Sequence, residues 1–108
     1  MENDDAMKTN INTKKLGKKQ IIVLHRMINE QLVIRSVKDA HDMSEDINLQ
    51  DEEGDNDYEK ITPEFLNSLY NRGLFEITSW MPALHIDITT FRIKKTVLPL
   101  FKTVLCQK

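Results

Sequence analysis

The chain has 108 residues, of which 40% are hydrophobic and 30% charged, and its formal net charge is −2. This length fits one domain with a single core and is too short for two ordinary domains. The composition argues against a disordered chain, and no apolar run approaches the roughly 20 residues that cross a bilayer. The single cysteine, Cys106, excludes an intramolecular disulfide and a thiolate zinc cluster.

The sequence shows none of the common catalytic or metal-binding patterns. His25, His41 and His85 have no paired spacing typical of metal ligands, so no metal is expected. There is no glycine-rich phosphate loop and no recognisable Ser-His-Asp arrangement. We therefore expect a protein that is not an enzyme and binds no cofactor. The amino-terminal segment lacks the apolar middle of a secretory signal, which predicts a cytoplasmic location, or the cytoplasm of a host cell.

The first structured element is expected after a polar amino-terminal segment. Residues 1–17 show no apolar periodicity and predict a flexible basic arm, which leaves one domain over residues 18–108. From Lys18 onward, apolar side chains recur at the spacing of a helix. They are Ile21, Leu24, Ile28 and Leu32.

Residues 33–50 allow two interpretations. Val33, Val37 and Ala40 have a spacing that suits a second helix. The run LVIRSV is also β-branched enough to form a short strand. The helix is the working prediction, and the strand remains open.

Acidic residues concentrate in residues 42–59, which hold nine acids and no lysine or arginine. The rest of the chain carries 15 basic and eight acidic residues. Residues 50–60 are predicted to form a solvated, mobile acidic loop, because no register supplies the glycine and glutamate of a calcium loop. The alternative is an acidic patch that mimics phosphates.

Residues 62–73 carry the signals of a capped helix. Thr62 can cap the first turn, Pro63 suits the first helical position, and Glu64 complements the positive helix end. Gly73 can adopt a positive φ and end the helix. The expected apolar face consists of Phe65, Leu66, Leu69 and Tyr70.

Two strands and a helix are expected after Gly73. Residues 74–78 and 86–93 alternate apolar and polar side chains, which predicts two antiparallel strands. Pro82 is expected to interrupt the first of these strands. The tail KKTVLPLFKTVLCQK, residues 94–108, has apolar side chains at helical intervals and predicts a carboxy-terminal helix.

This order of elements is that of a winged helix-turn-helix domain, an α+β fold with a three-helix core, a two-stranded wing and a C-terminal helix. The stretch ITPEFLNSLYNRGLFEI resembles the third helix and first wing strand of winged-helix transcription regulators of the MarR and PadR kind. FRIKKTVLPLFKTVL is similar to the segment that follows the wing. The chain departs from the pattern in its long acidic insertion and in lacking the glycine expected in the last element.

The resemblance implies a DNA-binding transcription regulator, with double-stranded DNA as its partner and a homodimer as its possible assembly. The third helix would offer polar side chains to base edges, while flanking cations neutralise phosphates. The expected base-reading residues are Asn67, Ser68, Asn71 and Arg72. The expected phosphate-binding residues are Lys14, Lys15, Lys18, Lys19, Arg92, Lys94 and Lys95. All of them can equally form an ordinary wet surface.

The second hypothesis is a protein-binding module, such as a small viral or mobile-element inhibitor of a host nucleic-acid enzyme. Its acidic block would imitate phosphates, and an aromatic side chain would anchor the partner. The residues concerned are Asp51, Glu52, Glu53, Asp55, Asp57, Trp80 and Met81. Trp80 and Met81 lie near the predicted hairpin tip, where they are either exposed for contact or folded back onto the core.

Overall fold

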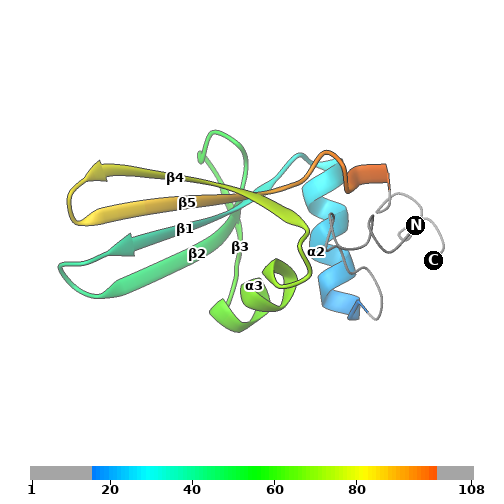
Figure 1. Ribbon diagram of the computed structural model, residues 1–108, viewed down its shortest axis with the longest axis horizontal. Helices are drawn as coiled ribbons and strands as arrows, with labels where there is room; N and C mark the ends of the chain where they lie inside the picture. The colour runs from blue at the N-terminus through cyan, green and yellow to red at the C-terminus, as the bar shows by residue number, and fades with distance from the viewer. Residues whose placement is uncertain (1–15, 100–108) are drawn as a thin grey trace, which may run out of the picture.

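The computed structural model describes residues 16–99 (Figure 1). The five strands form one antiparallel sheet in the order β3-β2-β1-β5-β4, and two helices pack against it. The elements in chain order are α2 (Lys18–Asn29), β1 (Val33–Asp39), β2 (Ser44–Gln50), β3 (Asp57–Lys60), α3 (Pro63–Tyr70), β4 (Phe75–Ala83) and β5 (Ile86–Ile93). The fold is therefore α+β, built around a single sheet.

The winged helix-turn-helix prediction is wrong. That fold needs a three-helix core, whereas residues 16–99 contain two helices and a five-stranded sheet. The error lies in residues 33–50, which form the β1–β2 hairpin and not a second helix. The open alternative of a strand at LVIRSV is correct, because alternating side chains place Ile34 and Ser36 in the interior with 0% and 3% exposure.

Both helices begin with a local hydrogen bond that satisfies an end group. The N–H of Gly17 donates to Oε1 of Gln20 at 2.8 Å at the start of α2. At the start of α3, Oγ1 of Thr62 accepts a hydrogen bond from the N–H of Phe65 at 3.2 Å, which confirms the predicted cap. Gly73 has φ of 75° and allows the chain to turn from α3 into β4.

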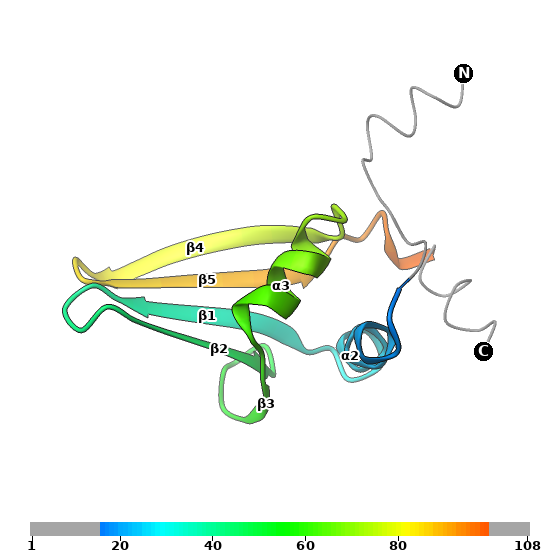
Figure 2. The ribbon, with the colours of Figure 1, turned by 90° about the horizontal axis from the view of Figure 1, so that it is seen from below.

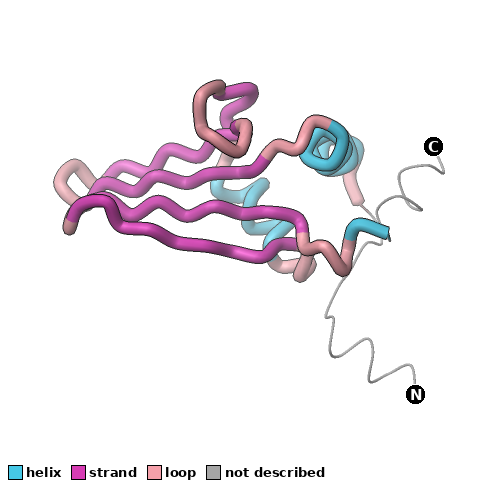
Figure 3. Tube along the Cα trace, turned by 90° about the horizontal axis from the view of Figure 1, so that it is seen from above, coloured by secondary structure: helices cyan, strands magenta, loops and turns pink. Residues whose placement is uncertain are grey.

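The core lies between the two helices and one face of the sheet. α3 crosses this face, and α2 lies at the end of the sheet where β1 begins (Figure 2). The largest fully buried side chains include Leu24 from α2, Leu69 from α3, and Ile34 and Leu49 from the sheet. The opposite face carries no helix among residues 16–99 (Figure 3), and we call it the open face.

The β1–β2 and β4–β5 hairpins project away from both helices (Figure 1). Their connecting turns, residues 40–43 and 84–85, are called the hairpin ends. The prediction that Pro82 interrupts its strand is wrong, because β4 continues to Ala83. Proline is tolerated there because β4 is an edge strand, and its register against β5 shifts between Trp80 and Ala83.

Two predicted segments fall wholly or largely outside the described residues. The basic arm over residues 1–17 is described from Leu16, and the carboxy-terminal tail over residues 94–108, predicted to be helical, is described to Pro99. Both segments stay predictions.

Replacing Leu69 with alanine tests the position of the core. Leu69 is 0% exposed beneath the sheet, so we expect its truncation to lower the free energy of unfolding by about 2–5 kcal/mol. The control is Ile22→Ala on α2, which is 51% exposed and is expected to change stability by less than about 1 kcal/mol. Urea unfolding measures both, and equal losses would contradict this core.

Candidate functional site

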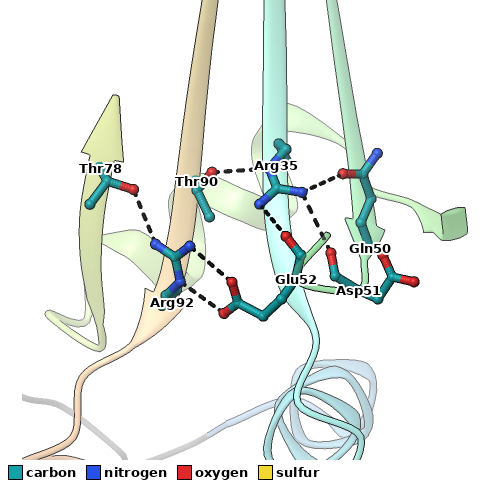
Figure 4. Close-up of polar contacts among 7 residues, drawn as sticks. All are labelled: Arg35, Gln50, Asp51, Glu52, Thr78, Thr90 and Arg92. Carbon is teal, nitrogen blue, oxygen red and sulfur yellow. Dashed lines mark hydrogen bonds and ion pairs between the residues drawn. The ribbon is translucent and has the colours of Figure 1, made fainter. Parts of the chain in front are cut away.

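The open face is covered at one end by the connection between β2 and β3. We call residues 51–56 of this connection the acid loop. The prediction of a loop over residues 50–60 is wrong at its end, because Asp57–Lys60 form β3 and pair with β2. The predicted solvated loop is thereby reduced to six residues that two arginines hold against the sheet (Figure 4).

Arg35, at the middle of β1, holds the backbone of the acid loop. Its Nε donates to Oγ1 of Thr90 and its Nη1 donates to Oε1 of Gln50, both at 3.0 Å. Its guanidinium also donates to the carbonyl oxygens of Asp51 at 3.5 Å and Glu52 at 3.1 Å. The side chain therefore ties strands β1, β2 and β5 to the start of the acid loop (Figure 4).

Arg92, near the end of β5, holds the side chain of Glu52. Its Nε and Nη2 donate to the two carboxylate oxygens at 2.9 and 3.0 Å, which is a bidentate ion pair. Its Nη1 donates to Oγ1 of Thr78 on β4 at 3.1 Å. The hydrogen bonds from Arg92 lower the pKa of the Glu52 carboxyl, and the same contact raises the pKa of the guanidinium. Arg35, Arg92 and their partners are called the arginine clamp.

The acid loop also has internal support. The carboxylate of Asp51 accepts hydrogen bonds from the N–H of Asp55 at 2.7 Å and from Nδ2 of Asn56 at 3.0 Å. Gly54 has φ of +80°, and a Cβ there would lie 3.1 Å from Nη1 of Arg35. The turn thus needs glycine both for its backbone conformation and for the close approach of Arg35.

The acid loop and Trp80 meet on the open face. Glu53 and Gly54 line a hollow of about 390 Å³ together with Trp80 of β4 and Ile88 of β5. Trp80 is 65% exposed, so it does not fold back onto the core. Asp57 accepts a hydrogen bond from Nε2 of Gln50 at 2.6 Å. Of the protein-binding residues predicted from the acidic block, Glu53 therefore shares this hollow with Trp80.

Further exposed apolar side chains lie in the hairpin ends and in the adjoining part of β4. Met43 is 85% exposed, Met81 is 56% exposed and Leu84 is 96% exposed. These three side chains line a second hollow of about 400 Å³, which also includes His85. Met43 has φ of 59°, a conformation that costs a non-glycine residue about 1–2 kcal/mol.

The residues predicted to read DNA bases lie on α3 or directly after it. Asn67 and Asn71 are exposed, and Arg72 is half-buried. The hydroxyl of Ser68 accepts a hydrogen bond from Nε2 of Gln20 on α2 at 2.8 Å and donates to a backbone carbonyl. The hydroxyl of Ser68 therefore links the two helices.

The predicted phosphate-binding residues do not form one surface around α3. Lys18 and Lys19 are exposed at the start of α2, and Nζ of Lys19 lies 3.0 Å from Oε2 of Glu59. Arg92 belongs to the arginine clamp on the open face, which is the sheet face opposite α3. Lys14 and Lys15 lie outside the described residues.

Lys94 and Lys95 directly follow β5, where Lys94 is half-buried and Lys95 is exposed. Contact of any of these residues with DNA stays a prediction.

Two features of the structure were not predicted from the sequence: the contacts of Arg35 and the stacking of two histidines. Arg35 gave no signal beyond its place in an alternating run, and its role depends on strands that are distant in sequence. His41 and His85 stack at the hairpin ends with ring centroids 4.0 Å apart. Only the pairing of β1 with β5 brings these two histidines together.

No protein-family model, curated protein or solved structure matches this chain. Within residues 16–99, neither helix has both the length and the apolar character needed to cross a bilayer.

The Glu52→Gln variant tests the arginine clamp. It keeps the side-chain shape but removes the charge that Arg92 binds, so we expect faster amide hydrogen exchange in the acid loop. Because the pair is partly exposed, the global free energy of unfolding should fall by no more than about 1 kcal/mol. Glu53→Gln, in the same loop and outside the clamp, is the matched control. Equal exchange rates in the two variants would contradict the clamp.

The lowered pKa of Glu52 predicts the pH dependence of the clamp. A carboxyl whose pKa is lower in the folded state adds stability that is complete above its ordinary value of 4.5. This contribution is lost as the pH falls below 4.5 through the lowered value. We expect acid-loop amide exchange, corrected for intrinsic rates, to accelerate over this range in the wild type. The Glu52→Gln variant should lack this step, and a step of equal size there would contradict the assignment.

Proposed function

We propose that this chain is a non-catalytic protein-binding module that docks its open face onto a basic surface of another protein. The observation that carries the proposal is Trp80, which is 65% exposed beside the acid loop in one hollow. Large exposed aromatic side chains are the usual anchors of protein interfaces. A cytoplasmic location remains a prediction.

The charge around Trp80 specifies the chemistry of the partner. Glu53 and Asp55 are exposed in the acid loop, whereas Arg35 and Arg92 are engaged by the arginine clamp. The open face therefore presents acidic groups next to an aromatic anchor. Complementary potential favours a partner with basic groups around an apolar pocket. Nucleic-acid-binding proteins carry such basic surfaces, and this supports the phosphate-mimic hypothesis.

A separate group of exposed apolar side chains lies near the hairpin ends, in the hollow lined by Met43, Met81 and Leu84. Met81 follows Trp80 in β4, and Met43 lies in the β1–β2 turn. The positive φ of Met43 would suit glycine or asparagine better, so the methionine is held there at a cost in stability. Methionine side chains adapt their shape to a partner surface. The exposure of Met43 and Met81 therefore supports protein contact near the hairpin ends.

The DNA-binding hypothesis stays an untested prediction with less support from the geometry. Its expected cations are divided between the open face and the helices, and residues 16–99 hold 14 acidic and ten basic side chains. Affinity for duplex DNA comes largely from neutralised phosphates. A net negative surface works against such binding.

The proposal is tested with two point variants of the open face. A candidate partner is a protein that co-purifies with the wild-type chain. It is accepted as a partner only when the purified protein binds the purified chain with a measured affinity. We expect Trp80→Ser to weaken that affinity at least about 30-fold, the effect of an interface anchor worth about 2 kcal/mol. Glu53→Lys should also weaken it, and higher salt should weaken the wild-type complex. Point variants are preferable to deletion of residues 50–59, which would remove most of β3.

Two controls separate docking from unfolding. Ile22→Ser replaces another exposed apolar residue and Glu64→Lys reverses another exposed acid, both on the helices. Both controls should keep the wild-type affinity. The proposal fails if the controls weaken binding as much as Trp80→Ser does. A second combined result would also contradict the proposal. In it, the chain binds duplex DNA, higher salt weakens that DNA binding, and Glu53→Lys strengthens it. A second copy of this chain as partner would support the predicted homodimer.

A further inference from the structure

The two hairpin ends are joined to each other beyond the last strand pairs. β1 ends at Asp39, which lies opposite Ile86 at the start of β5. The N–H of Ala40 donates to the carbonyl oxygen of His85 at 2.8 Å. This contact places the β1–β2 turn, which contains His41, directly against the β4–β5 turn.

Three metal-ligating side chains meet at this junction. Asp39, His41 and His85 each offer one ligand atom, and these three atoms all lie within 4.8 Å of one another. The two imidazole rings are stacked, with centroids 4.0 Å apart and an interplanar angle of 4°. Imidazole lone pairs lie in the plane of the ring, so the two rings must tilt out of this parallel stack to direct one nitrogen each toward a common ion.

The carboxylate of Asp39 is held beside the histidines by the backbone. Its Oδ1 accepts a hydrogen bond from the N–H of His41 at 2.9 Å. Because this bond uses one of two oxygens, the carboxylate keeps capacity for a ligand while its position is fixed. The ligand set is thus partly organised before any ion binds.

Two imidazoles and one carboxylate are the ligands of a divalent transition metal such as Zn²⁺. Ligand atoms around a tetrahedral zinc ion lie about 3.3 Å apart, given bond lengths of about 2.0–2.2 Å. The ligand atoms lie within 4.8 Å of one another, so side-chain rotations that tilt the stacked rings are needed to reach that spacing. Residues 38–46 and 83–87 contain five acids and one lysine, which also favours a cation.

We propose that Asp39, His41 and His85 bind one Zn²⁺ ion, or a transition-metal ion of similar preference, across the two hairpin ends. Water completes the coordination. The ion joins two turns that are distant in the chain and stiffens the hollow lined by Met43, Met81 and Leu84. The site depends on the junction of the turns and not on what the open face binds.

The experiment is a titration of the tag-free chain with Zn²⁺ alone, in which isothermal titration calorimetry measures the binding. We expect one saturable site per chain in the wild type. His41→Ala, His85→Ala and Asp39→Asn should each weaken binding at least about tenfold. His25→Ala is the matched control, because His25 is an exposed histidine on α2, where its contact is with Asn29. It should bind as the wild type does.

A spectroscopic readout guards against variants that merely unfold. Amide NMR shifts of the wild type should change on Zn²⁺ addition within residues 39–43 and 84–86. The Asp39→Asn side chain keeps an oxygen that can accept the hydrogen bond from the N–H of His41. The NMR spectrum of this variant without metal should therefore be that of a folded protein. Absence of saturable binding would overturn the proposal. Unchanged binding in His41→Ala and His85→Ala, or an equal loss in His25→Ala, would also overturn it.

Discussion

The antiparallel pairing of β1 with β5 is the constraint on which the rest of the structure depends. Each of these strands belongs to a hairpin that forms locally, β1 with β2 and β5 with β4. The pairing of Ile34 with Phe91, continued to Asp39 with Ile86, joins the two hairpins into one sheet. A joined sheet presents one continuous apolar face, and α3 can pack against it. The pairing of β1 with β5 therefore creates both faces of the sheet, the one that packs in the hydrophobic core and the open face.

The same pairing sets the chemistry of the open face. It places Arg35 beside Thr90, and it brings Arg92 to the side of β1 where the acid loop folds back. The two guanidiniums are then used to hold the loop, which leaves acids and Trp80 as the exposed groups. At the far end, the same strands bring the two hairpin ends into contact. The pairing of β1 with β5 thus determines both the charge of the open face and the contact between His41 and His85.

Sequence patterns predicted the elements whose signals are local. The cap at Thr62, the glycine at Gly73 and the alternation over residues 86–93 each reflect interactions within a few residues. The prediction for residues 33–50 was wrong because the spacing of Val33, Val37 and Ala40 also fits a helix, and because β5, one of the two strands that pair with β1, lies far away in the chain. For the same reason, neither the arginine clamp nor the histidine stack could be found from spacing.

The most direct test is a nuclear Overhauser measurement across β1 and β5 in the isotope-labelled chain. The pairing predicts contacts between the backbone protons of Arg35 and Thr90 and of Val37 and Ile88, with extended chemical shifts over residues 33–39. Helical shifts and sequential amide contacts over residues 33–50, without contacts to β5, would contradict the fold. The open face and the histidine junction would then lose their structural basis.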